Sequence, residues 1–199
     1  MLDRDQPCDV ELDLAGDAEL PDLGAVDVCV SNAAITTTVA AAHRMTREQW
    51  QRDLDVNLTG AFRVIQACLP GMRERGFGRI VVISSAAARS GLPGQVAYAA
   101  SKAGLLGMTR TIAAENAHKG VTANAILPGL VATEAVLAMP EEILGAGRAS
   151  IPTGRLVEPA EIADLVALLA SDAAGSITGE AISVDGGIHL NTRSLTRRG

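Results

Sequence analysis

A phenol and an amine are spaced in this sequence so that they could act together on a carbonyl or alcohol group. Tyr98, the only tyrosine, precedes Lys102 by four residues, within SSAAARSGLPGQVAYAASKAGLLGMTR at 84–110. In a helix this spacing places both side chains on one face. An ammonium about 4 Å from a phenol favours the phenolate by roughly 4 kcal/mol at an effective dielectric of about 20. We therefore expect the pKa of Tyr98 to fall from about 10 toward neutrality, where general acid/base catalysis is efficient.

Two further polar side chains could complete such a site. Ser85 ends an apolar run, and its hydroxyl could hydrogen-bond a carbonyl or carbinol oxygen. Asn57 interrupts a long helical pattern in DVNLTG, next to Gly60, where an amide can bind water or a freed backbone carbonyl. Taken singly, each has an ordinary explanation: an exposed phenol beside a solvated amine, a turn-forming serine, an asparagine on a helix surface. Their coincidence at one edge of the fold is what favours catalysis.

The elements that must position these residues alternate between strand and helix. Strands are predicted at 26–34, 78–86, 120–129 and 180–187, with a weaker edge strand at 8–14. Helices are predicted at 46–75, where Thr46, Glu48 and Gln49 give a start signal, at 96–119, and from Pro159 onward. This alternation indicates an α/β fold with a parallel sheet covered on both faces. Ligands are expected beyond the carboxyl ends of the strands, beneath a mobile segment at 134–158.

Composition narrows the functional class. The 199 residues suit one domain, 1–199, with a flexible tail at 190–199. The formal net charge of −6 excludes a basic nucleic-acid-binding surface. No apolar run is long enough to span a membrane and the first residues do not form a signal peptide, so a cytoplasmic protein is expected. Three widely spaced cysteines and three scattered histidines predict reduced thiols and no metal site: Cys8, Cys29, Cys68, His43, His118 and His189.

The segment around Tyr98 resembles the active-site segment of the short-chain dehydrogenase/reductase family, with Ser85 thirteen residues before Y-x-x-x-K. Other motifs similar to that family follow along nearly the whole chain: SNAA at 31–34, with Ala in place of the usual last Gly, VNLTGAF at 56–62, NAILPGLVAT at 124–133 and ITGEAISVDGG at 177–187. The 3-oxoacyl-carrier-protein reductase and bacterial NAD-dependent alcohol dehydrogenase branches are the most similar. The resemblance implies a Rossmann-like doubly wound parallel sheet.

The same resemblance implies an oxidoreductase that interconverts a secondary alcohol and a ketone by hydride transfer to or from NAD(P). In it Tyr98 is the general acid/base, Lys102 lowers its pKa and binds the nicotinamide ribose, Ser85 polarises the carbonyl, and Asn57 holds a water of a proton relay. The implied cofactor-binding residues are Asp3, Asp13, Leu14, Asn32, Ala33, Ala34, Tyr98, Lys102, Pro128, Gly129, Val131 and Thr133. Asp3, as an acidic residue ending a strand, is expected to select NAD in preference to NADP.

One part of the family pattern has no counterpart here. The first strand, the Gly-rich turn T-G-x-x-x-G-x-G that holds the pyrophosphate, and the first helix are lacking. We considered an internal or misread start of a longer gene, a truncated inactive paralogue, and a strand at 8–14 that moves beside 26–30 and repairs the sheet. The alternative to an active enzyme is therefore an inactive partner subunit. The resemblance implies that helices 46–75 and 96–119 pack across the interface of a homodimer or homotetramer, and an inactive subunit that retains both could associate with a full-length relative. A small-molecule alcohol or ketone is the expected substrate of the active form.

Overall fold

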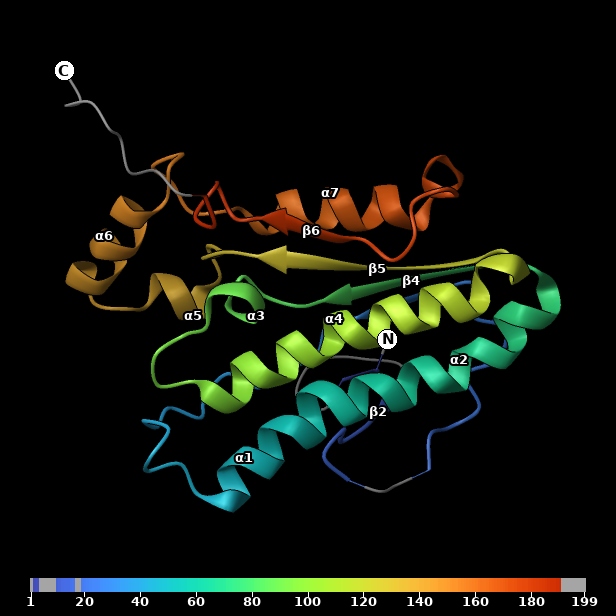
Figure 1. Cartoon of the computed structure of the whole chain (residues 1–199), viewed down its shortest axis with the longest axis horizontal. Coiled ribbons are helices and arrows are strands. Elements are labelled where there is room, and N and C mark those ends of the chain that lie inside the picture. The colour runs from blue at the N-terminus through green and yellow to red at the C-terminus, as the bar shows by residue number, and fades with distance from the viewer. Residues whose placement is uncertain (1, 4–9, 17–18, 191–199) are drawn as a thin grey trace.

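A four-stranded parallel sheet forms the centre of the molecule (Figure 1). The computed structural model describes residues 2–3, 10–16 and 19–190. The strands pair in the order β3-β4-β5-β6, with bounds β3 Val28–Ser31, β4 Gly78–Ile83, β5 Val121–Pro128 and β6 Ala181–Val184. Each of the four main predicted strands is thus confirmed, and all four run parallel, which brings their carboxyl ends to one edge.

The helices begin where the sequence signals predict. The side chains and backbones of Thr46 and Gln49 bond reciprocally at distances of 3.2 and 3.0 Å, and Pro159 occupies the first turn of its helix. The predicted helix at 46–75 consists of α1 (Arg47–Leu54), the π-helical segment η1 (Asp55–Gly60) and α2 (Ala61–Arg75). The helix at 96–119 is α4 (Val96–Asn116) followed by η2 (Ala117–Lys119), and α7 spans Pro159–Ala170 before η3 (Asp172–Ala174).

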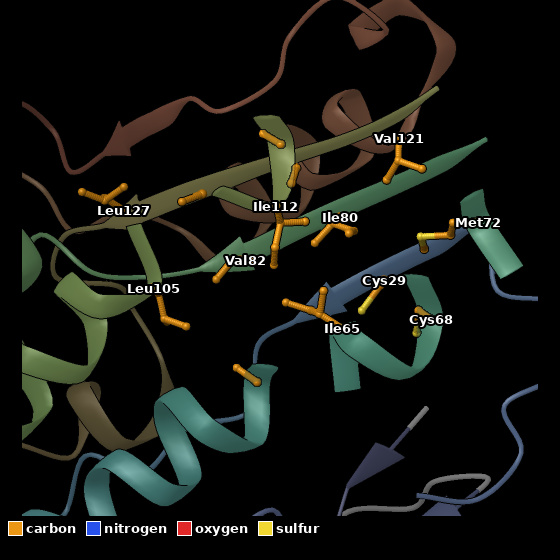
Figure 2. Close-up of a cluster of buried hydrophobic side chains, with 14 residues drawn as sticks. Cys29, Ile65, Cys68, Met72, Ile80, Val82, Leu105, Ile112, Val121 and Leu127 are labelled. Atoms are coloured by element: carbon orange, nitrogen blue, oxygen red, sulfur yellow. The ribbon is translucent and has the colours of Figure 1, made fainter. Parts of the chain in front are cut away.

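Helices cover both faces of the sheet, as a doubly wound fold requires. Helices α2 and α4 pack on one face and α7 on the other, so every residue of β4 and β5 except the last is buried. Figure 2 shows the larger core cluster, which is built from aliphatic and sulfur-containing side chains: Cys29, Ala61, Ile65, Cys68, Met72, Ile80, Val82, Leu105, Ile112, Ala113, Val121, Ala123, Ala125 and Leu127. The few aromatic residues of the chain take no part in it.

The outer strand β3 is less buried than the sequence predicts. Only Cys29 of this strand is buried, while Val28 and Val30 are 41% and 44% exposed among the described residues. The idea that a strand at 8–14 repairs the sheet is wrong. Within the described residues, β2 (Val10–Glu11) pairs with β1 (Leu2–Asp3) in a separate two-stranded sheet, and β4 is the sheet neighbour of β3.

The segment 134–158 is also more regular than predicted. It contains α5 (Glu134–Leu137) and α6 (Glu141–Ser150), and it has a small core of its own made by Leu144, Ile151 and Leu156. Backbone bonds between 130–132 and Val157 join its two ends. The glycines and prolines that suggested mobility instead connect short helices at the carboxyl edge of the sheet.

Two glycine substitutions test how tightly this edge is packed. A Cβ on Gly129 would lie 2.8 Å from both Cα and Cβ of Asp185, so Gly129→Ala should lower the free energy of unfolding by about 1–3 kcal/mol. The matched control is Gly107→Ala in α4, where a Cβ meets nothing within 4 Å; it should raise stability by about 0.5–1 kcal/mol. Urea unfolding followed by circular dichroism measures both. Equal effects of the two changes would contradict the close approach at Gly129.

Candidate active site

Ser85, Tyr98 and Lys102 meet at the carboxyl end of β4. After β4, the backbone N–H of Ser84 donates to the Ile126 carbonyl at 2.8 Å, and that of Ala86 donates to the Pro128 carbonyl at 2.9 Å, so the chain stays beside β5. The buried Ser84 hydroxyl donates to the Lys102 carbonyl at 2.8 Å, which fastens α4 to this strand end. The Ser85 hydroxyl lies near the Tyr98 phenol, whose pKa it lowers, and it accepts from the Ala87 N–H at 3.1 Å, at the start of α3 (Ala87–Ser90).

Lys102 is buried although it is charged at neutral pH. Its side chain is 3% exposed, and Nζ donates to the Ile83 carbonyl at 2.8 Å, the last carbonyl of β4. Burial disfavours the ammonium and lowers the pKa of Lys102 from 10.5 to about 8. The bond to Ile83 uses one of the three N–H donors of an ammonium, so the group can serve a second acceptor at the same place.

The expected effect of Lys102 on Tyr98 is wrong in direction. Burial raises the pKa of Tyr98 above its ordinary value of 10, and the nearby Ser85 hydroxyl opposes this only in part. Nζ of Lys102 lies 5.7 Å from the centroid of the Tyr98 ring and donates to a backbone carbonyl. Desolvation of the half-buried phenol is therefore the dominant influence, and the phenol is protonated at neutral pH.

Asn57 holds a loop beside the site. It lies in η1, where the predicted interruption of the helix is a π-helical turn of the kind often found at functional sites. Its side chain is 1% exposed; Oδ1 accepts from the Ile35 N–H at 2.8 Å and Nδ2 donates to the Ile35 carbonyl at 3.0 Å. The sequence suggested a water or a carbonyl freed within the helix as its partner, whereas the structure shows the backbone of the loop that follows β3.

Two side chains that the sequence analysis missed fix the same loop. Asp53, fully buried in α1, accepts from the Thr38 hydroxyl at 2.6 Å through Oδ1, while its Oδ2 has no hydrogen-bond partner among the residues that the structure describes. Gln95, three residues before Tyr98, donates to the Thr36 carbonyl at 2.9 Å. The only feature of the sequence that could have indicated these two residues is their position. Asp53 is an acidic residue on the inner face of a helix, and Gln95 is an amide just before α4.

Replacing Asn57 tests this loop anchor. Asn57→Ala removes both bonds to Ile35 and leaves a partly buried N–H and carbonyl unpaired, so the free energy of unfolding should fall by about 2–3 kcal/mol. The control is Asn32→Ala at the exposed end of β3, which should change stability by less than about 0.5 kcal/mol. Chemical denaturation measures both. A neutral Asn57→Ala would show that the loop is held by its other contacts.

The predicted cofactor-binding residues lie in three places, two of them on the carboxyl edge of the sheet. Asn32, Ala33 and Ala34 follow β3 and are exposed. The residues after β5 form the second group: Pro128 and Gly129 close the strand, Val131 pairs with the backbone of Val157, and Thr133 caps α5 by accepting from the Val136 N–H at 3.4 Å. Both groups therefore lie at the same edge as Ser85, at the ends of neighbouring parallel strands.

The N-terminal candidates lie apart from these groups. Leu14 packs against Gly60 of η1, where a Cβ would approach the Leu14 Cβ to 2.7 Å. The Asp13 carboxylate accepts from the Ala15 N–H at 3.0 Å and so closes a local turn. Asp3 lies in β1, and its side chain is outside the described part of the chain, as are Cys8 and the tail at 191–199. A hollow of about 380 Å³ between Ala15 and α1 contains none of the predicted catalytic residues.

Metal sites and membrane-spanning helices are two further features that the described residues could form. In the ranges 2–3, 10–16 and 19–190, no group of His, Cys, Asp and Glu is arranged to hold a metal ion. Among the helices of the same ranges, none is both long and apolar enough to cross a lipid bilayer.

Comparisons with known proteins point to one family. Residues 8–189 match the profile of a family described as enoyl-(acyl carrier protein) reductase. An acetoacetyl-CoA reductase of Rhizobium meliloti is 53% identical over 167 residues, which cover 83% of this chain and 69% of that protein.

Two solved structures agree with this assignment. A 3-oxoacyl-[acyl-carrier protein] reductase of Brucella melitensis superposes with a TM-score of 0.80 at 35% identity, covering 84% of this chain and 64% of that one. A structure from Agrobacterium tumefaciens with bound NADP is described as a 2-deoxy-D-gluconate 3-dehydrogenase. It superposes with a TM-score of 0.78 at 32% identity, covering 82% of this chain and 67% of that one. The chain spans about two thirds of the length of the proteins it matches.

Proposed function

The chain belongs to the short-chain dehydrogenase/reductase family, and from this premise we propose that it reduces the keto group of a 3-oxoacyl thioester to a secondary alcohol. The observation that carries the proposal is that the Ser85 hydroxyl, the Tyr98 phenol and the buried Lys102 lie together at the carboxyl end of β4, with Ser85 close enough to lower the pKa of Tyr98 against the effect of burial. A carbonyl oxygen placed between two hydroxyl donors is polarised and has a proton source within reach.

The roles of the residues follow from their protonation states. Because the pKa of Tyr98 is raised, the phenol is protonated at neutral pH and can give its proton to the carbonyl oxygen. Ser85 donates a hydrogen bond to that oxygen, and the resulting phenolate at Tyr98 is stabilised by the nearby Lys102 ammonium until a proton returns from solvent. The opposite reaction, oxidation of an alcohol, needs the phenolate first and should become faster as the pH rises.

A nicotinamide dinucleotide fits this edge of the sheet. Lys102 has N–H donors for hydroxyl groups of a ribose, and the exposed Asn32, Ala33 and Ala34 present small side chains beside it. The bound nicotinamide supplies the hydride. We propose NADPH as the donor because NADP is bound in the similar structure from Agrobacterium tumefaciens; the preference for NAD expected from Asp3 has no support in the comparisons.

Two observations support the proposed class of substrate, namely the substrates of the similar proteins and an exposed apolar surface on the segment that contains α5 and α6. Acetoacetyl-CoA and 3-oxoacyl-carrier-protein both carry a ketone two carbons from a thioester, and these are the substrates named for the two reductases above. Beyond Thr133, the segment containing α5 and α6 exposes Leu137, Met139 and Ile143, which are 53%, 41% and 59% exposed. Such side chains suit the apolar part of an acyl or pantetheine arm.

The decisive assay follows the oxidation of NADPH by acetoacetyl-CoA, with mass spectrometry of the product. We expect 3-hydroxybutyryl-CoA to appear in step with cofactor consumption, and free acetoacetate to be a much poorer substrate. NADH replaces NADPH in a second arm to test the cofactor preference. Absence of turnover with either cofactor, together with association with a longer relative, would instead favour the inactive partner subunit, which no observation in the described structure supports at present.

A further inference from the structure

Cys29 and Cys68 form a pair of buried thiols that the proposed reaction does not use. Cys29 lies in β3 and Cys68 in α2, and they are 5% and 6% exposed as free thiols. Figure 2 shows their side chains as neighbours in the core cluster, one on the strand and one on the helix. They are close enough for each thiol to shift the pKa of the other. Two neighbouring thiols have a chemistry that a single buried cysteine lacks.

The two thiols are not equivalent. The neighbouring Cys29 lowers the pKa of Cys68, whereas Cys68 and burial raise the pKa of Cys29. Cys68 therefore ionises first, and the thiolate is the form that reacts with oxidants. Cys29 remains a thiol beside it, placed to react with whatever forms on the Cys68 sulfur.

The pair lies in the interface between β3 and α2, two elements that pack against each other. Other buried groups of the main core, such as Ile80 and Val121, lie on the inner strands β4 and β5. A molecule as small as a peroxide needs a local opening only between β3 and α2 to reach the sulfur atoms.

We propose that Cys29 and Cys68 are a modification site at which hydrogen peroxide or a similar hydroperoxide closes an intramolecular disulfide bond. The Cys68 thiolate attacks the peroxide, an S–O bond forms, the O–O bond breaks, and the leaving hydroxide takes up a proton to become water. The Cys29 sulfur then attacks the sulfur of the Cys68 sulfenic acid, the S–S bond forms, and the hydroxyl leaves as a second water. The two sulfurs together lose two electrons, which reduce the peroxide.

The proximity of the two thiols decides whether oxidation of Cys68 ends in a disulfide or in an oxidised single cysteine. A sulfenic acid on an isolated buried cysteine persists or is oxidised further to a sulfinic acid. Here the resolving thiol is a neighbour of the reacting sulfur, so ring closure needs only a local rearrangement. The bond would tie the outer strand to α2, three residues before Asn32 and hence close to the cofactor edge, without consuming any residue of the catalytic group.

Peptide mapping of the oxidised protein tests the proposal. In a Cys8→Ser protein the pair is the only source of thiols, and trypsin places its members in peptides 5–44 and 64–73. The folded protein is treated with hydrogen peroxide at a dose that fully oxidises glutathione in the same buffer, then denatured and alkylated. We expect both alkylatable thiols to be lost, the two peptides to be joined, and dithiothreitol to restore both thiols.

A second variant separates the two steps. In Cys8→Ser/Cys29→Ala the same treatment should leave a sulfenic acid on Cys68 that dimedone labels, whereas the Cys8→Ser protein should show no dimedone label. The proposal is overturned if both cysteines of the folded Cys8→Ser protein are still alkylated, if Cys68 becomes sulfinic acid while Cys29 stays free, or if the disulfide joins two chains. Trp50 fluorescence before and after treatment verifies that the protein stayed folded.

Discussion

Replacing Tyr98 by phenylalanine should lower kcat for reduction of a 3-oxoacyl thioester by about 10²–10⁴-fold, which is the range supplied by a positioned general acid. The phenol lies near Ser85 and is half-buried, so the ring remains in place while the proton source disappears. The free energy of unfolding should fall by only about 1 kcal/mol, since one polar group is lost. Steady-state kinetics and urea unfolding of the same preparation separate the two effects.

Serine variants provide matched controls for this prediction. Ser85→Ala removes the second donor to the carbonyl oxygen and should cost about 10²-fold or more in kcat. Ser90→Ala removes an exposed hydroxyl at the end of α3 that bonds the Ala86 and Gly91 carbonyls, and should leave kcat unchanged. A Tyr98→Phe protein with near-normal turnover would show that the proton comes from another group, and the proposed mechanism would fail.

The parts of this fold that depend on local sequence were predictable. Thr46 with Gln49 and Pro159 start helices because their caps are made by neighbours in the chain. The four strands of the main sheet were recognisable as short runs rich in β-branched or other apolar residues bounded by turns. Even the interruption of the long helix at Asn57 could be predicted, because an amide next to Gly60 suits an irregular turn better than a regular one.

The features that were missed depend on contacts between distant segments. The exposure of Val28 and Val30 depends on which distant elements pack on the outer strand β3, and the apolar sequence of the strand does not reveal this. The bond from Thr38 to Asp53 joins a loop to a helix across fifteen residues with no periodic pattern to announce it. The small core of Leu144, Ile151 and Leu156 forms only when both ends of its segment meet at Val131 and Val157.

The pKa values of Tyr98 and Lys102 could not be predicted from the sequence, because burial affects them more strongly than the spacing between the two residues does. From the sequence, Lys102 is an ammonium one helical turn from a phenol, and attraction is the only visible interaction. In the structure both groups are desolvated, and desolvation acts on them in opposite directions, raising the pKa of Tyr98 and lowering that of Lys102. The predicted pair is correct in its residues and position, whereas the predicted acid strength of the phenol is not.

The buried ammonium implies that Lys102 is kept at a cost in stability, and Lys102→Met should show it. A pKa lowered from 10.5 to about 8 corresponds to about 3 kcal/mol of destabilisation when the amine is charged in both states. Loss of the bond to the Ile83 carbonyl offsets about 1 kcal/mol of this. We therefore expect Lys102→Met to be more stable than the parent by about 1–2 kcal/mol at neutral pH, with kcat reduced by about 10²-fold or more.

The pH dependence of this difference identifies its cause. Between pH 8 and 10.5 the unfolded chain binds the proton of Lys102 and the folded chain has released it, so the stability of the parent should rise with pH across this window. The advantage of Lys102→Met should shrink accordingly and reverse near the upper limit, where only the lost hydrogen bond remains. Lys119→Met, at the other lysine of the chain and exposed in η2, should show neither the gain nor its pH dependence. A gain of equal size at every pH would mean that Met packs better than Lys at this place and that the charge of Lys102 costs nothing.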